Sequence, residues 1–452
     1  MRRWETAVMI LFAFVIGLTF ILSCGNGGES NKSNEFSGNW TWVAGSDSAN
    51  DIGYYGTLEV PEASNVPQAR EQSLGWIGAD NNLWLFGGFY WNAVSLFNDV
   101  WRFDGMYWTW MSGNNTPNNP GVYGPATSAL PGARYNSVSW TDAEGHLWML
   151  GGHGYDRSGT YGYLNDLWQF DGTYWTWISG SDTVDNPGVY RSTASSLPGG
   201  RSNSVSWAGT DGGLWLFGGY GYDGFATLGY LNDLWRFNGI YWTWMSGGDT
   251  VNNPGQYGTK GMPAGSNVPG ARVDSISWVD SNGHLWLFGG YGYDGFATLG
   301  YLNDLWRFNG IYWTWMSGGD TVNNPGQYGT KGMPAGSNVP GARARSVSWV
   351  GNDGGLWLFG GFGYEGSSTS GFLNDLWRFD GVRWTWISGE DTVNKPGYYG
   401  TKGLPAGSNM PGARYYSTSW TTTDGDLWLF GGYGYPASGG VDNLNDLWRY
   451  KP

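Results

Sequence analysis

A six-residue stretch, Leu-Trp-Leu-Phe-Gly-Gly, recurs along the chain and constrains its fold more than any other feature. It stands at 214–219, 285–290, 356–361 and 427–432, and near-copies stand at 83–88 and 147–152. The second glycines lie at 88, 152, 219, 290, 361 and 432, so successive copies are 64, 67, 71, 71 and 71 residues apart. A regular spacing of this kind indicates one supersecondary unit that is repeated six times.

Each unit contains four short segments with the pattern of strands. In one unit these are a polar–apolar segment at 201–207, an apolar run at 214–217, a third segment at 231–237 and an alternating one at 241–245. Gly, Asn and Asp separate them, as they do at turns between strands. Four short strands in each of several repeats are typical of a propeller blade. The sequence therefore predicts an all-β, six-bladed β-propeller with four antiparallel strands per blade.

The repeats resemble the kelch family, which includes galactose oxidase. The features that carry the resemblance are the apolar strand before Gly-Gly, the tryptophan of the fourth strand and an Asn-Asp-Leu-Trp motif in the third strand. The motif stands at 165–168, 232–235, 303–306, 374–377 and 445–448, with Asn-Asp-Val-Trp at 98–101. The resemblance covers residues 39–452. It departs from the family in length, because a kelch unit has about 50 residues and these units reach 71.

The tryptophans predict how the ring closes. Each complete unit holds five, and the chain has 32, of which Trp4 and Trp91 lie outside the pattern. The sixth unit ends just after Trp448 and has no fourth strand of its own. The missing pair, Trp40 and Trp42, stands at the other end of the repeat region. We therefore expect the N-terminal strand to complete the last blade, because an open array would leave a sheet edge exposed.

The first residues have the pattern of a bacterial lipoprotein signal. Arg2 and Arg3 precede an apolar run at 7–22, which is short for a membrane span of roughly 20 residues and suits a secretory signal. The run ends at Leu22-Ser23-Cys24, which resembles a lipobox, and Cys24 is the only cysteine. We expect a signal at 1–23, lipidation of Cys24, a Gly/Ser/Asn-rich tether at 24–38 and a propeller at 39–452. An ordinary signal peptide or an uncleaved anchor is the alternative.

The resemblance to a lipoprotein implies a partner and a localisation. The partner is a membrane, to which the lipid anchor attaches the protein, and the localisation is the bacterial cell envelope. Gly25 follows the cysteine, where an Asp marks inner-membrane retention in some bacteria, so the outer membrane is favoured. The net charge of −14 argues against nucleic acid. Three histidines are too few for a repeated metal site, and we expect no metal and no cofactor.

The long connections place the candidate binding face. Those from the fourth strand to the next unit, and from the second strand to the third, leave from the same end of the blade, and long loops on a rigid scaffold often bind ligands. They carry the aromatic residues Tyr155, Tyr163, Tyr222, Phe225, Tyr230, Tyr293, Phe296, Tyr301, Tyr364 and Tyr435. Of these, Tyr155, Tyr222, Tyr293, Tyr364 and Tyr435 are our candidate ligand contacts, since aromatic rings beside Asn and Asp suit carbohydrate. Packing between the loops is the alternative.

An arginine opens the first strand of every unit and is the second candidate. The six are Arg70, Arg134, Arg201, Arg272, Arg343 and Arg414. Guanidinium groups bind carboxylates bidentately, and arginines at similar positions line the pocket in kelch domains that bind acidic peptides. A structural alternative remains open: each arginine could pair with the Asp of the Asn-Asp motif, blade after blade.

The symmetry of the chain favours binding over catalysis. Residues 214–272 and 285–343 are identical over 59 positions, whereas an acid–base pair needs different groups in different places. Glu365 alone departs from its equivalents Asp223 and Asp294. Copper oxidase chemistry of the galactose oxidase kind needs a cysteine that a lipidated chain lacks. We therefore expect a lipid-anchored binding propeller for a glycan or acidic peptide; the alternatives are an enzyme similar to kelch sugar-acid epimerases and a purely structural envelope protein.

Overall fold

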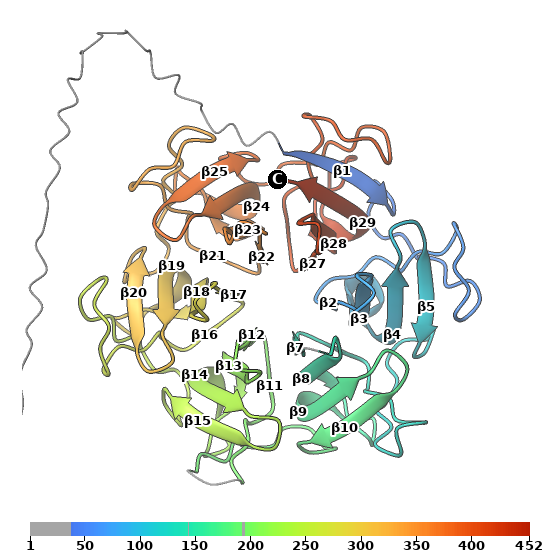
Figure 1. Ribbon diagram of the computed structural model, residues 1–452, viewed down its shortest axis with the longest axis horizontal. Helices are drawn as coiled ribbons and strands as arrows, with labels where there is room; N and C mark the ends of the chain where they lie inside the picture. Colours follow the sequence, from blue (N-terminus) through green and yellow to red (C-terminus); the bar gives the residue numbers. More distant parts are fainter. Residues whose placement is uncertain (1–37, 143, 192–194) are drawn as a thin grey trace, which may run out of the picture. The chain divides into compact units, whose positions relative to one another are not determined.

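The computed structural model describes residues 38–142, 144–191 and 195–452. The predicted signal, Cys24 and nearly all of the tether lie outside the described residues. The described residues form a ring of six antiparallel sheets, so the predicted six-bladed, all-β propeller is confirmed (Figure 1). The helical element of the described residues is one 3-10 turn, η1 (Trp91–Ala93). None of the described helices is long and apolar enough to cross a membrane.

Each blade has four strands, and in five blades the first strand is split into a two-residue and a four-residue piece. The first strands, blade by blade, are β2 (Leu74–Ile77), β6 and β7 (Arg134–Tyr135, Val138–Thr141), β11 and β12 (Arg201–Ser202, Val205–Ala208), β16 and β17 (Arg272–Val273, Ile276–Val279), β21 and β22 (Arg343–Ala344, Val347–Val350), and β26 and β27 (Arg414–Tyr415, Thr418–Thr421). The second strands are β3 (Leu83–Tyr90), β8 (Leu147–Tyr155), β13 (Leu214–Tyr222), β18 (Leu285–Tyr293), β23 (Leu356–Tyr364) and β28 (Leu427–Gly434).

The third and outer strands complete the blades in the same order. The third strands are β4 (Ser95–Phe103), β9 (Tyr161–Phe170), β14 (Leu228–Phe237), β19 (Leu299–Phe308), β24 (Ser370–Phe379) and β29 (Asp442–Lys451). The outer strands are β5 (Trp108–Ser112), β10 (Trp175–Ser179), β15 (Trp242–Ser246), β20 (Trp313–Ser317), β25 (Trp384–Ser388) and β1 (Asn39–Ala44).

The Gly-Gly pair forms a bulge inside the second strand and does not end it. In β13 the register with β14 shifts between Phe217 and Gly219, and the strand then continues to Tyr222. Gly218 and Gly219 have φ of 65° and 101°, conformations that glycine adopts far more readily than other residues. A Cβ on Gly219 would also lie 2.2 Å from the Ser204 hydroxyl oxygen. The pair is therefore required by the bulge, and the second strand extends further toward the candidate binding face than the sequence pattern suggested.

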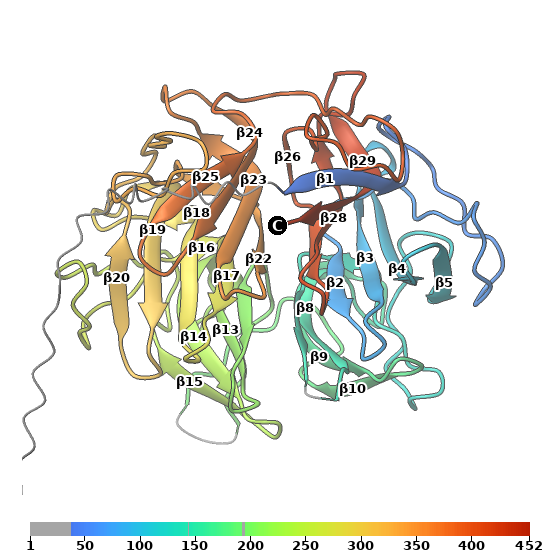
Figure 2. The same cartoon turned by 45° about the horizontal axis from the view of Figure 1, so that its top comes forward.

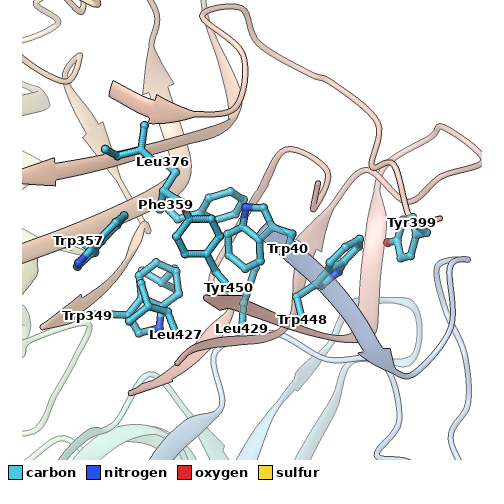
Figure 3. Close-up of a cluster of buried hydrophobic side chains, with 12 residues drawn as sticks. Trp40, Trp349, Trp357, Phe359, Leu376, Tyr399, Leu427, Leu429, Trp448 and Tyr450 are labelled. Atoms are coloured by element: carbon cyan, nitrogen blue, oxygen red, sulfur yellow. The ribbon is translucent and has the colours of Figure 1, made fainter. Parts of the chain in front are cut away.

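The N-terminal strand closes the ring as predicted. β1 pairs with β29 in antiparallel register, with Trp40 opposite Tyr450 and Trp42 opposite Trp448 (Figure 2). Trp40 is 2% exposed, and its ring lies 5.1 Å from Tyr450 and 5.5 Å from Phe359 of the neighbouring blade (Figure 3). The start of the repeat region is thus built into the core between the fifth and sixth blades.

Tryptophans fill the interfaces between blades. The third-strand tryptophans are completely buried, and the first tryptophan of each outer strand is at most 2% exposed. First-strand tryptophans also link blades by hydrogen bonds; for example, the Trp207 indole nitrogen donates to the Trp286 carbonyl oxygen, at 3.0 Å. The interpretation of the recurring tryptophans as packing residues is confirmed by this burial.

The long connection from each outer strand runs along the edge of the next blade and does not crowd the axial mouth. In the segment at 247–271, Ala264 forms a bridge with Trp313 of the next outer strand. Lys260 donates to the Gly318 carbonyl oxygen at 2.8 Å and lies 4.1 Å from the Trp315 ring. These segments therefore brace neighbouring blades.

Candidate functional site at the propeller axis

The six strand-opening arginines are buried inside the blades. Each is at most 2% exposed and pairs bidentately with the aspartate of the Asn-Asp motif. In the fourth blade the Arg272 nitrogens Nη1 and Nη2 lie 2.7 and 2.8 Å from the two carboxylate oxygens of Asp304. The other pairs are Arg70–Asp99, Arg134–Asp166, Arg201–Asp233, Arg343–Asp375 and Arg414–Asp446.

Further donors and acceptors saturate each pair. Asp304 also accepts hydrogen bonds from the Tyr257 hydroxyl and the Trp306 indole nitrogen, at 2.6 and 2.7 Å. Arg272 also donates to the carbonyl oxygens of Gly270 and Gly289. The geometry therefore corrects the candidate ligand-binding role of Arg70, Arg134, Arg201, Arg272, Arg343 and Arg414: these guanidinium groups hold the first strand, the third strand and a tyrosine of the long connection together.

A second circle of residues, two positions after each arginine, surrounds the propeller axis. We call these the axial residues: Gln72, Asn136, Asn203, Asp274, Arg345 and Tyr416. Each backbone N–H donates to the carbonyl oxygen of the axial residue in the preceding blade, at 3.0–3.3 Å, and Gln72 closes the circle by donating to Tyr416. All six blades are thus joined in one cyclic set of hydrogen bonds.

The side chains of the axial residues differ although the scaffold repeats. All six residues have φ between 52° and 65°, a region in which side chains are strained and glycine is the usual choice. None of the six is glycine in a chain with 79 glycines. The 59-residue identity between two units also ends at Arg272 and Arg343, immediately before Val273-Asp274 and Ala344-Arg345. Residues kept against backbone strain, and varied on a symmetric frame, are typical of functional positions.

A cavity of about 440 Å³ lies beside this circle, at the end of the blades where the second strand turns into the third. Residues from all six blades line it, and all six axial residues are among them. Its volume falls in the range of small-ligand sites.

A network centred on Asp274 provides the polar side of the cavity. Its carboxylate accepts hydrogen bonds from Asn203 Nδ2 at 2.5 Å and from the Tyr416 hydroxyl at 2.8 Å. Arg345 Nε lies 3.3 Å from the same carboxylate. Burial raises the pKa of Tyr416 well above its usual value, so its hydroxyl keeps the proton that it donates. The Arg345 side chain is 34% exposed, and its Nη atoms have no hydrogen-bond partner in the described part of the chain. It therefore offers a positive donor group to the cavity.

Aromatic rings form the opposite side. His153 stacks between Tyr161 and Tyr163, with ring centroids 4.3 Å apart in both pairs. Burial lowers the pKa of His153 to about 4, so the imidazole is neutral at pH 7. Tyr220 and Tyr230 continue this wall in the third blade. The cavity thus combines ring faces with a compact set of hydrogen-bonding groups.

The five candidate tyrosines do not line this cavity. Tyr222, Tyr293, Tyr364 and Tyr435 pack at the ends of their second strands against an aromatic ring of the preceding blade, at 5.6–6.2 Å. Tyr155 packs against Tyr161 of its own blade at 5.4 Å. Loop packing, the alternative considered from the sequence, describes their contacts. Tyr163 and Tyr230, from the wider set of loop aromatics, do line the cavity.

Glu71, next to the axial residue Gln72, is a buried acid with few compensating contacts. It is 1% exposed, and neither carboxylate oxygen has a hydrogen-bond partner of good geometry among the described residues. Burial raises the pKa of Glu71 to about 8, and Trp91 and Arg345 offset only part of this rise. The carboxyl is therefore largely protonated at neutral pH.

Sequence reasoning missed the axial residues although a signal was present. In every unit the arginine is followed by two variable residues and then by a serine, Ser73 in the first unit and Ser275 in the fourth. An alignment of the six units with one another would have shown this variation.

No family model and no curated protein matches the chain. The chain is similar to a solved structure titled "Structure of YjhT", with 14% identity, a TM-score of 0.49 and coverage of 84% of this chain and 95% of that one. It is also similar to a fungal alcohol oxidase of the AA5 family in complex with copper, with 13% identity, a TM-score of 0.44 and coverage of 89% and 77%. Neither likeness carries an argument about function. The six four-stranded blades are those of a β-propeller.

Proposed function

We propose that this protein is a lipid-anchored binding propeller that takes an acidic glycan in the axial cavity. The observation that carries the proposal is the concentration of variable, strained axial residues on a scaffold that otherwise repeats. A structural ring has no need of different side chains at six equivalent positions, whereas a ligand without sixfold symmetry does.

The chemistry of the lining favours a carbohydrate with an anionic group. The rings of Tyr163, Tyr220 and Tyr230 offer apolar faces for sugar C–H groups, and Asn136 offers an amide for a hydroxyl. The free Nη atoms of Arg345 suit a carboxylate or sulfate, which guanidinium groups bind with charge-assisted hydrogen bonds. An acidic peptide is less well matched, because the cavity holds a single arginine in contact with its own aspartate partner.

A glycan array tests the proposal. The full-length protein is screened against acidic and neutral glycans, and each hit is repeated with Arg345→Ala and Arg345→Lys. We expect Arg345→Ala to weaken the binding of acidic glycans at least tenfold. Arg345→Lys should recover part of this loss, because lysine restores the positive charge but cannot bind a carboxylate bidentately as a guanidinium group does. Arg383→Ala is the matched control, since Arg383 is an exposed arginine on the turn between β24 and β25. Absence of any glycan signal, or equal loss in the control, would count against this function and favour a purely structural role.

The proposed anchor has its own test. Cys24 is the only cysteine, so metabolic labelling with an alkyne fatty acid has a clean control. Wild-type protein should incorporate the label and partition with membranes, and Cys24→Ser should do neither. Unlabelled wild-type protein would mean that the signal is an ordinary one.

A further inference from the structure

Two exposed phenylalanines lie in equivalent loops of neighbouring blades, each between the second and the third strand. Phe225 lies between β13 and β14 and is 70% exposed, and Phe296 lies between β18 and β19 and is 69% exposed. A single exposed apolar side chain is ordinary. Here the same residue is exposed at the same position twice, whereas the second and fifth blades have Ser158 and Ser367 there.

Both phenylalanines are held by rigid loops. The Asp223 carboxylate accepts hydrogen bonds from the backbone N–H groups of Phe225 and Thr227, each at 2.8 Å. Asp294 accepts the same two bonds in the next blade, each at 2.8 Å. These aspartates are 2% exposed. The backbone that carries each ring is therefore held in place, which lowers the entropy that a partner must offset on binding.

The duplication determines what kind of partner can use both rings. The two loops belong to the 59-residue identical segments, so they present the same chemical surface twice, one blade apart. A partner that contacts both in the same way must itself carry the same group at regular intervals.

The surroundings favour a polysaccharide over a protein. A protein interface needs a contiguous apolar core, whereas each loop exposes one aromatic ring, with Leu228 or Leu299 only 38% or 37% exposed beside it. Single rings at intervals suit a sugar chain, in which each residue offers one C–H face. The Phe225 loop also joins the second and third strands that supply Tyr220 and Tyr230 to the cavity.

We propose that the ligand is a polysaccharide chain, with one acidic residue in the axial cavity and later residues stacked on Phe225 and Phe296. This inference rests on the proposed function and adds to it the length of the ligand. Simultaneous contacts along one chain raise the overall affinity because the second contact becomes intramolecular.

The experiment compares long and short forms of the same glycan. Calorimetry measures binding of the full-length protein to polygalacturonate, alginate and hyaluronan and to the di- to octasaccharides of each. We expect Phe225→Ala and Phe296→Ala each to weaken the polymer about fivefold, equally, and the double variant about twenty-five-fold. Disaccharide affinity should not change. Ile240→Ala and Ile311→Ala are the matched controls, because they remove side chains that are 82% and 72% exposed in the same two blades, at the opposite end.

The outcomes separate the two proposals. Disaccharide binding that depends on Arg345, with polymers bound no more tightly, would retain the proposed function and overturn this inference. If the double variant binds the polymer as tightly as the wild type does, Phe225 and Phe296 serve another class of partner, and this inference is also overturned. If the wild type binds none of these glycans, short or long, both proposals fail together.

Discussion

Trp40→Ala tests whether the N-terminal strand is a structural member of the last blade. Trp40 is 2% exposed and packs on Tyr450, Phe359 and Trp448. A tryptophan buries on the order of 200 Å², which at about 25 cal/mol per Å² corresponds to roughly 5 kcal/mol as an upper estimate. Trp→Ala substitutions in cores destabilise by about 3–5 kcal/mol. We expect a loss in this range in the free energy of unfolding.

The third blade provides the matched control. Trp242 is the equivalent residue of β15, is also 2% exposed, and packs on Phe237 at 5.2 Å as Trp40 packs on Tyr450 at 5.1 Å. Urea unfolding followed by circular dichroism should give the same loss for Trp40→Ala and Trp242→Ala within about 1 kcal/mol. If Trp40→Ala costs less than about 1 kcal/mol while Trp242→Ala costs 3–5 kcal/mol, the strand merely lies on the blade and the argument for closure is refuted.

Four further substitutions examine the buried polar groups. Tyr257→Phe removes the hydroxyl that lies 2.6 Å from the Asp304 carboxylate, so unfolding should require about 1.5–3 kcal/mol less; Tyr328→Phe, its copy in the next blade, should lose the same amount, and unequal losses would contradict the equivalence of the blades. Glu71 has a pKa of about 8 in the folded protein against an ordinary value of 4.5, so the folded state holds a proton that the unfolded state has lost between these values. Wild-type stability should therefore fall as pH rises from about 5 to 8, by up to about 1.4 kcal/mol per pH unit, and Glu71→Gln should remove this slope in urea titrations; an unchanged slope would mean that Glu71 is not the group responsible. Asp223→Ala removes the carboxylate that holds the Phe225 loop, and hydrogen exchange at residues 224–228 should speed up while the rest of the blade is unaffected; uniform exchange would show that the loop is held by other contacts.

The fold could be predicted because it depends on a local pattern that is repeated six times. The apolar run before Gly-Gly and the alternating Trp40-Thr41-Trp42 segment carry their strand assignments in their own spacing. Closure followed from counting tryptophans, because a blade without its outer strand would leave an unpaired edge.

The site could not be predicted in the same way, because its residues differ from unit to unit, whereas the pattern that predicts the fold consists of residues that recur. Every unit has an equivalent of Arg272 because every unit has an equivalent of its partner Asp304, and the pair belongs to the scaffold. The path of the long connection also depends on its contacts with the next blade, such as Lys260 with Trp315, and no local pattern in the sequence encodes that contact. Asp274 and Arg345 lie in different units of the sequence and form an ion pair only when the closed ring brings them together.

The cyclic hydrogen bonds of the axial residues couple the mobility of all six blades. Each axial residue uses its N–H toward one neighbour and its carbonyl toward the other, so a blade that tilts outward breaks two bonds at once and leaves two N–H and two carbonyl groups unpaired near the axis. Breathing of single blades is therefore disfavoured, and opening should be a concerted event of the whole ring. In native-state exchange, the amides of Asn203 and Asp274 should then share one opening free energy with Tyr416, on the far side of the circle.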